Sequence, residues 1–222
     1  MLPVVSKPLN FGFCFERPNF WFIASTTLNP ILCLLLFEFV VGLGSPTPDS
    51  NDNRHNIGFK IIDAINQKFG LSKQKPKFKG LLTTGNISNK KVYAIKPLTF
   101  MNNSGICIRE LLEYFKMDAE DVIVFHDDLD VEFGKIKAKF GGSSAGHNGI
   151  ASIDKFIGKD YSRVRIGIGK PDKKISVSDF VLNDFTDDEQ EHLEKITSNI
   201  IESLSILIDK KLDLFSSTVN NN

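Results

Sequence analysis

The chain has 222 residues and a formal net charge of zero, with 27 basic and 27 acidic side chains. Its length fits one domain, or one domain with an extension, and a hydrophobic content of 41% lets that domain bury a core without metal ions or disulfides. Composition therefore excludes a small disulfide-rich scaffold, and the neutral balance gives no general sign of nucleic-acid binding. Three widely spaced cysteines without a C-x-x-C pair indicate a reducing compartment and argue against a zinc site: Cys14, Cys33 and Cys107.

Residues 1–34 differ from the rest of the chain and are interpreted as an atypical N-terminal extension. They are rich in Phe, Pro and Leu and show no periodicity. The apolar run at 31–36 comes too late for a secretory signal, and one Arg beside one Glu does not fit a mitochondrial presequence. The extension is therefore an unusual targeting segment, a disordered segment or a mispredicted one. No stretch reaches the about 18 apolar residues of a membrane span, so we predict none.

From residue 35 onward, segments typical of strands and helices alternate. Short apolar or alternating runs predict strands over 34–41, 91–96, 121–126, 135–140 and 163–168, and 85–89 predicts a hairpin. Apolar residues at helical spacing predict helices over 56–69, 108–115 and 150–157. Asn56 is suited to begin the first of these helices and Gly70 to end it. Thr186 and Glu189 have the spacing of a capping box ahead of a long C-terminal helix that reaches Leu207.

This alternation predicts an α/β fold, a three-layer αβα single domain over 35–212 with a mixed, mostly parallel twisted sheet. The polar residues at 213–222 are interpreted as a tail. In such sheets, sites lie beyond the carboxyl ends of the strands. The loops at 42–56, 97–104 and 126–130 each follow a predicted strand, so we expect them to form one site.

Histidines are the main candidates for chemistry, and the chain has four. His192 falls on a predicted amphipathic helix and is interpreted as a surface residue, whereas His55, His126 and His147 lie beside Asn or Asp in loops. A histidine at a helix start is suited to act as a general base, because the helix dipole lowers its pKa and keeps it neutral. A nearby carboxylate, from Asp127 or Asp128, would oppose that shift but fix the tautomer. Each histidine also fits a loop or capping residue without chemistry.

Other chemistries have less support in the sequence. A metal-dependent peptidase would need ligands at H-x-x-x-H or H-E-x-x-H spacing, and a serine hydrolase would need a G-x-S-x-G turn. Neither pattern is present. Gly42 and Gly44 after a strand lack the third glycine of a dinucleotide-binding loop, and Pro46 follows them.

Taken in order, the loops resemble the motifs of the bacterial-type peptidyl-tRNA hydrolase family. The matching segments are VGLGSP at 41–46, RHN at 54–56, TFMNNSG at 99–105, HDDLD at 126–130, GHNG at 146–149 and RIGIG at 165–169. The resemblance extends over about residues 38–210. It implies a monomeric enzyme that hydrolyses the ester between a peptide and tRNA and releases free tRNA for translation. It implies no metal ion or cofactor, and a cytoplasmic or mitochondrial location agrees with the cysteine content.

The resemblance also implies roles for individual residues. His55 would be the general base that activates water, and Asp127 would orient it. Asn102 would bind the reacting end of the peptide and the developing oxyanion, while Asn148 would anchor the substrate or the water nearby. An ester needs little more than one base, one orienting acid and amide donors.

Ser45 is a departure from the family, which usually has Asn in this G-L-G-N-P turn. A serine hydroxyl is shorter than an asparagine amide and cannot span the same gap. Ser50 likewise stands where the family has an aromatic residue. We still group Ser45 with the substrate-binding residues, together with Phe100 and Met101, which we expect to line their loop. The departures leave a second hypothesis: a catalytically weak or inactive relative that acts as an RNA-binding adaptor.

The same resemblance implies a contact between four cations and the acceptor stem of the tRNA: Lys137, Lys139, Arg163 and Arg165. Within each pair, residues two apart share one face of a strand, so that they can present two cations to a phosphate. The lysines between 73 and 79 have no such support and are interpreted as part of a solvated linker.

Overall fold

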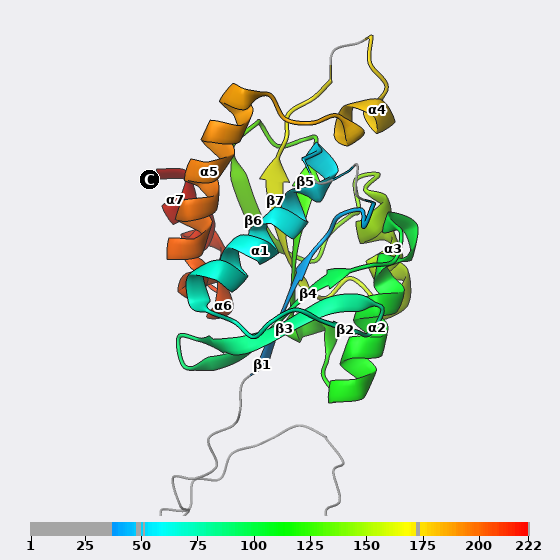
Figure 1. Cartoon of the computed structure of the whole chain (residues 1–222), viewed down its shortest axis with the longest axis vertical. Helices are drawn as coiled ribbons and strands as arrows, with labels where there is room; N and C mark the ends of the chain where they lie inside the picture. Colours follow the sequence, from blue (N-terminus) through cyan, green and yellow to red (C-terminus); the bar gives the residue numbers. More distant parts are fainter. Residues whose placement is uncertain (1–36, 48–49, 51, 172–173, 222) are drawn as a thin grey trace, which may run out of the picture. The chain divides into compact units, whose positions relative to one another are not determined.

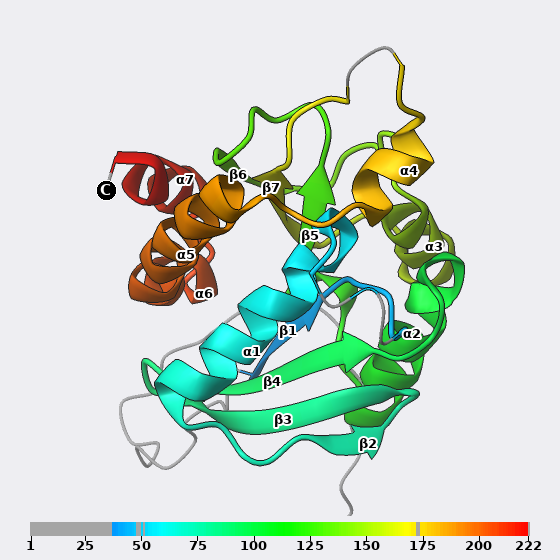
Figure 2. The same ribbon diagram turned by 45° about the horizontal axis from the view of Figure 1, so that its top comes forward.

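A computed structural model describes residues 37–47, 50, 52–171 and 174–221. Within these residues, seven strands form one sheet in the order β2-β3-β4-β1-β5-β7-β6 (Figures 1 and 2). The strands are β1 (Phe37–Gly42), β2 (Lys75–Lys77), β3 (Gly80–Ile87), β4 (Lys90–Pro97), β5 (Val122–Asp128), β6 (Ile136–Phe140) and β7 (Ser162–Gly167).

The sheet is mixed, as the sequence predicts. The central strands β4, β1, β5 and β7 are parallel to one another, whereas β2, β3 and β6 are antiparallel additions at the two edges. Of the six pairings between described strands, three are parallel. The parallel part is therefore the centre of the sheet, where the candidate loops leave β1, β4 and β5.

Seven α-helices are described: α1 (Ile57–Phe69), α2 (Ser104–Phe115), α3 (Asn148–Ile157), α4 (Val177–Leu182), α5 (Asp187–Glu202), α6 (Leu204–Ile208) and α7 (Leu212–Asn221). Single 3-10 turns are η2 (Arg54–Asn56), η3 (Met101–Asn103) and η4 (Ala119–Asp121). Gly70 ends α1 in the left-handed conformation, and the capping box of Thr186 and Glu189 begins α5, as predicted. No helix in this part of the chain is long and apolar enough to cross a membrane.

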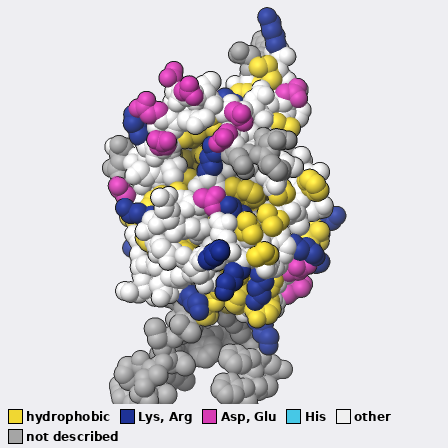
Figure 3. All heavy atoms as spheres, in the orientation of Figure 1, with side chains coloured by type: hydrophobic (Ala, Val, Ile, Leu, Met, Phe, Trp, Pro, Cys, Tyr) yellow, Lys and Arg dark blue, Asp and Glu magenta, His cyan; other side chains and the backbone are white. Residues whose placement is uncertain are grey.

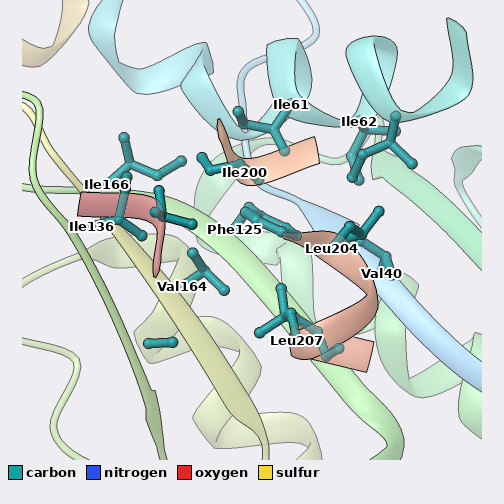
Figure 4. Close-up of a cluster of buried hydrophobic side chains, with 14 of the residues drawn as sticks. Val40, Ile61, Ile62, Phe125, Ile136, Val164, Ile166, Ile200, Leu204 and Leu207 are labelled. Carbon is teal, nitrogen blue, oxygen red and sulfur yellow. The ribbon is translucent and has the colours of Figure 1, made fainter. Parts of the chain in front are cut away.

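Helices cover both faces of the sheet, which confirms the three-layer αβα prediction. In β1, Val40 points to one face and joins the buried cluster with α1, α5, α6 and α7. Its neighbours Phe39 and Val41 point to the other face and join α2 and α3. This period of two lets a buried strand serve two cores at once. Figure 4 shows the first cluster, in which the strand residues Val40, Phe125 and Val164 face Ile61, Ile200 and Leu204.

Two glycines bring the start of α1 against the carboxyl ends of β1 and β5. A side chain at Gly58 would collide with the main chain of Leu43 and with the carbonyl oxygen of Phe125. A side chain at Gly42 would collide with the main chain of Gly58. The close approach needs glycine at both positions, and it puts the η2 turn, with His55, at the end of the central strands.

The C-terminal region differs from the prediction. The long helix is broken at Ser203 into α5 and α6, and the predicted polar tail at 213–222 is wrong for the described residues, because they form α7. Phe215 and Val219 of α7 are buried. The Asn220 side chain accepts from the main-chain N–H of Ile136 at 2.9 Å and donates to its carbonyl at 2.8 Å. The Asn220 amide thus bonds to main-chain groups of the edge strand β6 that a neighbouring strand would otherwise pair with. This contact gives a polar residue of the C-terminal segment a structural role.

The interpretation of 73–79 as a linker is also wrong, because Lys75–Lys77 form the edge strand β2, paired with β3. All three residues are exposed, so the strand has no apolar face that periodicity could reveal. The ammonium group of Lys77 lies 4.0 Å from the centroid of the Tyr114 ring. In the view of Figure 3, Lys and Arg side chains gather near this edge of the sheet, among hydrophobic ones.

Candidate active site

Residues from the predicted loops at 42–56 and 126–130 line one cavity of about 540 Å³, beyond the carboxyl ends of β1 and β5. The predicted loop at 97–104 is not part of its lining. One wall is polar and carries His55, Asp127 and His147. Another part of the lining is mainly apolar and belongs to α4, which supplies Val177, Val181 and Leu182. Neither α4 nor these apolar residues were predicted from the sequence.

The carboxylate of Asp127 is the centre of the polar wall. Its Oδ1 atom lies 2.9 Å from Nδ1 of His55 and 3.0 Å from Nε2 of His147. The residue is only 3% exposed. Burial by itself would raise the pKa of Asp127, but the contacts with His147 and His55 outweigh burial and hold the pKa far below its usual range. Asp127 is therefore an anion at neutral pH and accepts from both imidazoles.

His55 lies on the η2 turn, directly before α1. Because Asp127 can only accept, Nδ1 of His55 carries the proton and Nε2 is the unprotonated nitrogen. Burial lowers the pKa of His55, while the charge and hydrogen bond of Asp127 raise it by more, so the pKa lies above its usual value. From the sequence we expect the helix dipole to lower the pKa of His55 and a carboxylate to raise it. In the structure the net shift of this pKa is upward, in the direction set by the carboxylate.

His147 is a second partner of Asp127 to which the sequence assigned no role. It is the N-cap of α3, and its Nδ1 accepts from the main-chain N–H groups of Gly149 at 3.1 Å and Ile150 at 3.3 Å. The proton must therefore be on Nε2, which donates to Asp127. The available signal was the position of His147 before Asn148 and Gly149 at a predicted helix start.

His126 lies beneath this group and is buried. Its Nδ1 lies 2.7 Å from the carbonyl oxygen of Asp127, and its ring meets that of His147 edge-on at 5.0 Å. Burial, followed by the proximity of His147, lowers the pKa of His126 to about 3. His126 is thus neutral at physiological pH and supports the site by packing.

His55, Asp127 and His147 are the one described group whose spacing suits a metal ion, since their ligand atoms all lie within 4.8 Å. A metal needs an unprotonated nitrogen from each histidine. Nδ1 of His147 is already the acceptor for two main-chain N–H groups, so its Nε2 cannot offer a lone pair without forming an imidazolate. The hydrogen bonding of the cluster therefore fits a histidine oriented by a carboxylate better than a metal centre.

The two predicted amide residues lie on different elements. Asn148 lines the cavity, and Asn102 is exposed on η3, which packs against α3. Neither side chain makes a hydrogen bond with another described residue, so both amides are available to a ligand. Met101 lies against Gly149 and packs on the second hydrophobic cluster, whereas Phe100 is 67% exposed.

Ser45 is held by its main chain. The Asn56 side chain accepts from the Ser45 N–H and donates to the Ser45 carbonyl at 3.1 Å. The Ser45 hydroxyl lies 3.1 Å from that of Thr47, which in turn lies 2.5 Å from the hydroxyl of Ser50. Asn56 thus ties the β1 loop to the η2 turn, and the serine hydroxyl is directed into a local network.

The four predicted phosphate-binding cations do not form one exposed group. Arg163 is 1% exposed, donates to Asp154 at 2.6 Å and lies over Tyr161, so its prediction as a tRNA contact is corrected. Arg163 lies on the face of β7 that packs near Asp154 of α3. The two-residue spacing of 163 and 165 shows that they share a face, but not whether a helix covers it. Arg165 is half-buried and forms a two-point ion pair with Asp128, at 2.6 and 3.0 Å.

Lys137 and Lys139 lie on the edge strand β6, opposite Arg165 and Arg163. Lys137 is exposed and Lys139 is partly exposed. Burial lowers the pKa of Lys139, and the adjacent Arg165 and Arg163 lower it further. The two lysines are therefore the members of the predicted group that an anion can reach.

Comparisons with known proteins agree with this geometry. A family model described as peptidyl-tRNA hydrolase matches residues 39–222. A peptidyl-tRNA hydrolase of Pelagibacter ubique is 81% identical over 188 residues, which are 85% of this chain and 100% of the relative. One of Bartonella henselae is 43% identical over 181 residues, covering 82% and 94% of the two chains. The crystal structure of a peptidyl-tRNA hydrolase from Acinetobacter baumannii has a TM-score of 0.78 at 32% identity, covering 84% of this chain and 95% of the other.

Titration of the histidines tests the electrostatics of the site. We expect the imidazole resonance of His55 to titrate with a midpoint above 6.5, because Asp127 raises its pKa. The His126 resonance should stay constant from pH 8 to pH 5, because its pKa is about 3. Proton NMR with His55→Gln and His126→Gln for assignment measures both, and a His126 midpoint above pH 5 would contradict the buried neutral state.

Proposed function

The chain belongs to the peptidyl-tRNA hydrolase family, and on that basis we propose that His55 is the general base of its reaction. The enzyme hydrolyses the ester bond of peptidyl-tRNA and releases a peptide and a free tRNA. The observation that carries the assignment is the 2.9 Å contact between Nδ1 of His55 and the buried carboxylate of Asp127, beside the cavity. The adaptor hypothesis is not favoured, because the base and its orienting acid are both retained.

In this mechanism Nε2 of His55 takes a proton from a water molecule, whose oxygen attacks the ester carbonyl carbon. Asp127 stabilises the imidazolium that forms and keeps Nδ1 protonated. When the tetrahedral intermediate collapses, the imidazolium returns the proton to the leaving ribose oxygen. His147 is a positioning residue here, because its hydrogen bond holds the Asp127 carboxylate from the other side.

The amides of Asn102 and Asn148 would serve the substrate directly. Both are exposed, and their side chains have no hydrogen-bond partner among the described residues. We assign Asn102 to the developing oxyanion and the reacting end of the peptide, and Asn148 to the substrate or the attacking water. Ser45, Phe100 and Met101 would border the same part of the site, with Met101 acting through packing.

The tRNA would contact the β6 edge of the sheet. Lys137 and Lys139 supply exposed charge there, and Arg165 adds to the local potential although Asp128 neutralises part of it. Arg163 has no part in this proposal.

The cytoplasm is the proposed location, which the bacterial relatives support; they lend no support to the mitochondrial alternative. Action as a monomer stays a prediction from the family resemblance.

Replacement of the base tests the central assignment. We expect His55→Ala to lower kcat for peptidyl-tRNA by about 10²–10⁴-fold, the usual contribution of a general base. His192→Ala is the matched control, since His192 is exposed on α5 and should leave kcat unchanged. Steady-state hydrolysis assays measure both, and near-normal turnover by His55→Ala would remove His55 from the mechanism.

Replacement of Asp127, the partner of the base, should shift the pH dependence of activity in a defined direction. Because His55 works only when neutral, activity is lost as pH falls through its pKa. Asp127→Asn removes the anion that raises this pKa and leaves burial to lower it, so the acid limb of kcat/KM should move to lower pH. The maximal rate should fall by about 10²–10⁴-fold, because the tautomer is no longer held. An unshifted acid limb would mean that another group titrates.

Two lysines test the tRNA contact. In the double variant Lys137→Gln and Lys139→Gln we expect KM for peptidyl-tRNA to rise about tenfold, with kcat unchanged. The slope of log kcat/KM against log salt should decrease in magnitude by about 1.4–1.8 if both contact phosphates. Lys195→Gln with Lys211→Gln is the control, because it changes net charge equally at two exposed positions elsewhere. Equal slopes in the two double variants would contradict the contact.

A further inference from the structure

Arg54 directly precedes His55 and is only 6% exposed. Its Nη1 donates to the carbonyl oxygens of Asn183 at 3.1 Å and Asp184 at 2.5 Å, and its Nη2 donates to Glu189 at 2.6 Å. A buried guanidinium with this many acceptors is held in one orientation. The acceptors all belong to the connector between α4 and α5 or to the first turn of α5, about 130 residues further along the chain.

Aromatic rings complete the surroundings of the guanidinium. Its central carbon lies 4.6 Å from the centroid of Phe180, on α4, and 5.1 Å from that of Phe185. Both distances are within the range of cation–π contact. Phe180 thus joins α4 itself to Arg54, in addition to the contacts with the connector.

The main chain around Arg54 also contacts the connector between α4 and α5. Its N–H donates to the carbonyl of Asn183 at 3.1 Å, and Asn53 forms an antiparallel bridge with Asp184. The η2 turn and the connector therefore pair side by side, directly next to His55.

Besides Arg54, helix α4 is held by Phe180 and Val181, which are partly buried against the hydrophobic cluster of Figure 4. None of its residues, all of which are described, is buried, and η2 is the element with which it makes most contact. Figures 1 and 2 both show α4 beside the N-terminal end of α1, where η2 lies. Yet Val177, Val181 and Leu182 of α4 form the apolar part of the wall of the cavity that His55 also lines. The place of that wall thus depends on what Arg54 holds.

We infer that Arg54 is a positioning residue for hydrolysis, which locks the turn that carries His55 and the α4 wall into one unit. The inference rests on the proposed function, in which His55 is the base, and it adds that the peptide lies in the cavity that His55 and α4 line. Through Arg54, a peptide that fills the cavity against α4 is held in register with the base. Since the reaction needs the water and ester within a fraction of an ångström of the base, this register affects both turnover and binding.

Lysine cannot replace arginine in this role. Its single ammonium group cannot reach two carbonyls and a carboxylate in the plane of a fork, and it lacks a flat face for Phe180. Arg54→Lys therefore keeps the charge and tests the geometry.

The experiment compares Arg54→Lys with the wild-type enzyme on two substrates: tRNA carrying one N-acetylated amino acid, and tRNA carrying an N-acetylated peptide of several residues. We expect kcat to fall about tenfold or more on both, because His55 is displaced. KM should rise several-fold only for the longer peptide, because only that peptide reaches α4. A purely structural role for Arg54 would instead reduce the active fraction and lower the rate on both substrates equally, with KM unchanged.

Two variants at the start of α5 guard against a loss of folding. Glu189→Gln weakens one partner of Arg54 and should give the same pattern to a smaller degree. Thr186→Ala removes the 3.3 Å capping bond from the Glu189 N–H at the same helix start without touching Arg54, so it should lower Tm and leave kcat and KM unchanged. If Arg54→Lys does not fold, Glu189→Gln against Thr186→Ala decides the question.

The proposed function is tested separately, by comparing turnover of the wild-type enzyme with that of His55→Ala, which should be strongly reduced. Given that result, Arg54→Lys or Glu189→Gln with kcat and KM within twofold of wild type would overturn the inference alone. So would an equal loss on the two substrates without the KM difference. Reduced kcat with the length-dependent KM supports it.

Discussion

The structure of the site depends on one buried carboxylate that two histidines share. A buried anion is costly unless hydrogen bonds and charge compensate for lost hydration. Asp127 meets this requirement with His55 and His147, each donating to the same oxygen. Two main-chain N–H groups at the start of α3 set the tautomer of His147, so the helix start, the histidine and the carboxylate form one chain of donors and acceptors.

The fold has to bring these groups together from distant parts of the chain. His55 and Asp127 are 72 positions apart, and they meet because β1 and β5 are parallel neighbours whose carboxyl ends lie at one edge. The glycines at 42 and 58 then let α1 start against those ends. Any residue with a Cβ at Gly58 would move the helix start outward, and the base with it.

Three of the four arginines in the described part of the chain form ion pairs within the fold, and the fourth, Arg109, is exposed. Arg54, Arg163 and Arg165 each form an ion pair with a carboxylate, and the first two are buried. Guanidinium groups suit this use because their five donors can join several elements at once. At the β6 edge the exposed positive charge therefore comes from Lys137 and Lys139, so a chain of zero net charge can still carry a locally basic strand.

The sequence by itself determined the local features of this protein and the order of its motifs. Caps such as Gly70 and Thr186 act through nearest neighbours, and strand alternation follows from the backbone, so helix ends and the two faces of the sheet were predictable. The tertiary structure alone decided which element covers each face. Arg163 and Lys139 are both basic residues in strands where charged and apolar residues alternate. Yet Arg163 is buried beside α3, whereas Lys139 is partly exposed. Contacts between remote segments, which no local spacing encodes, likewise decide the role of His147, the wall formed by α4 and the hold of Arg54 on the connector that follows α4.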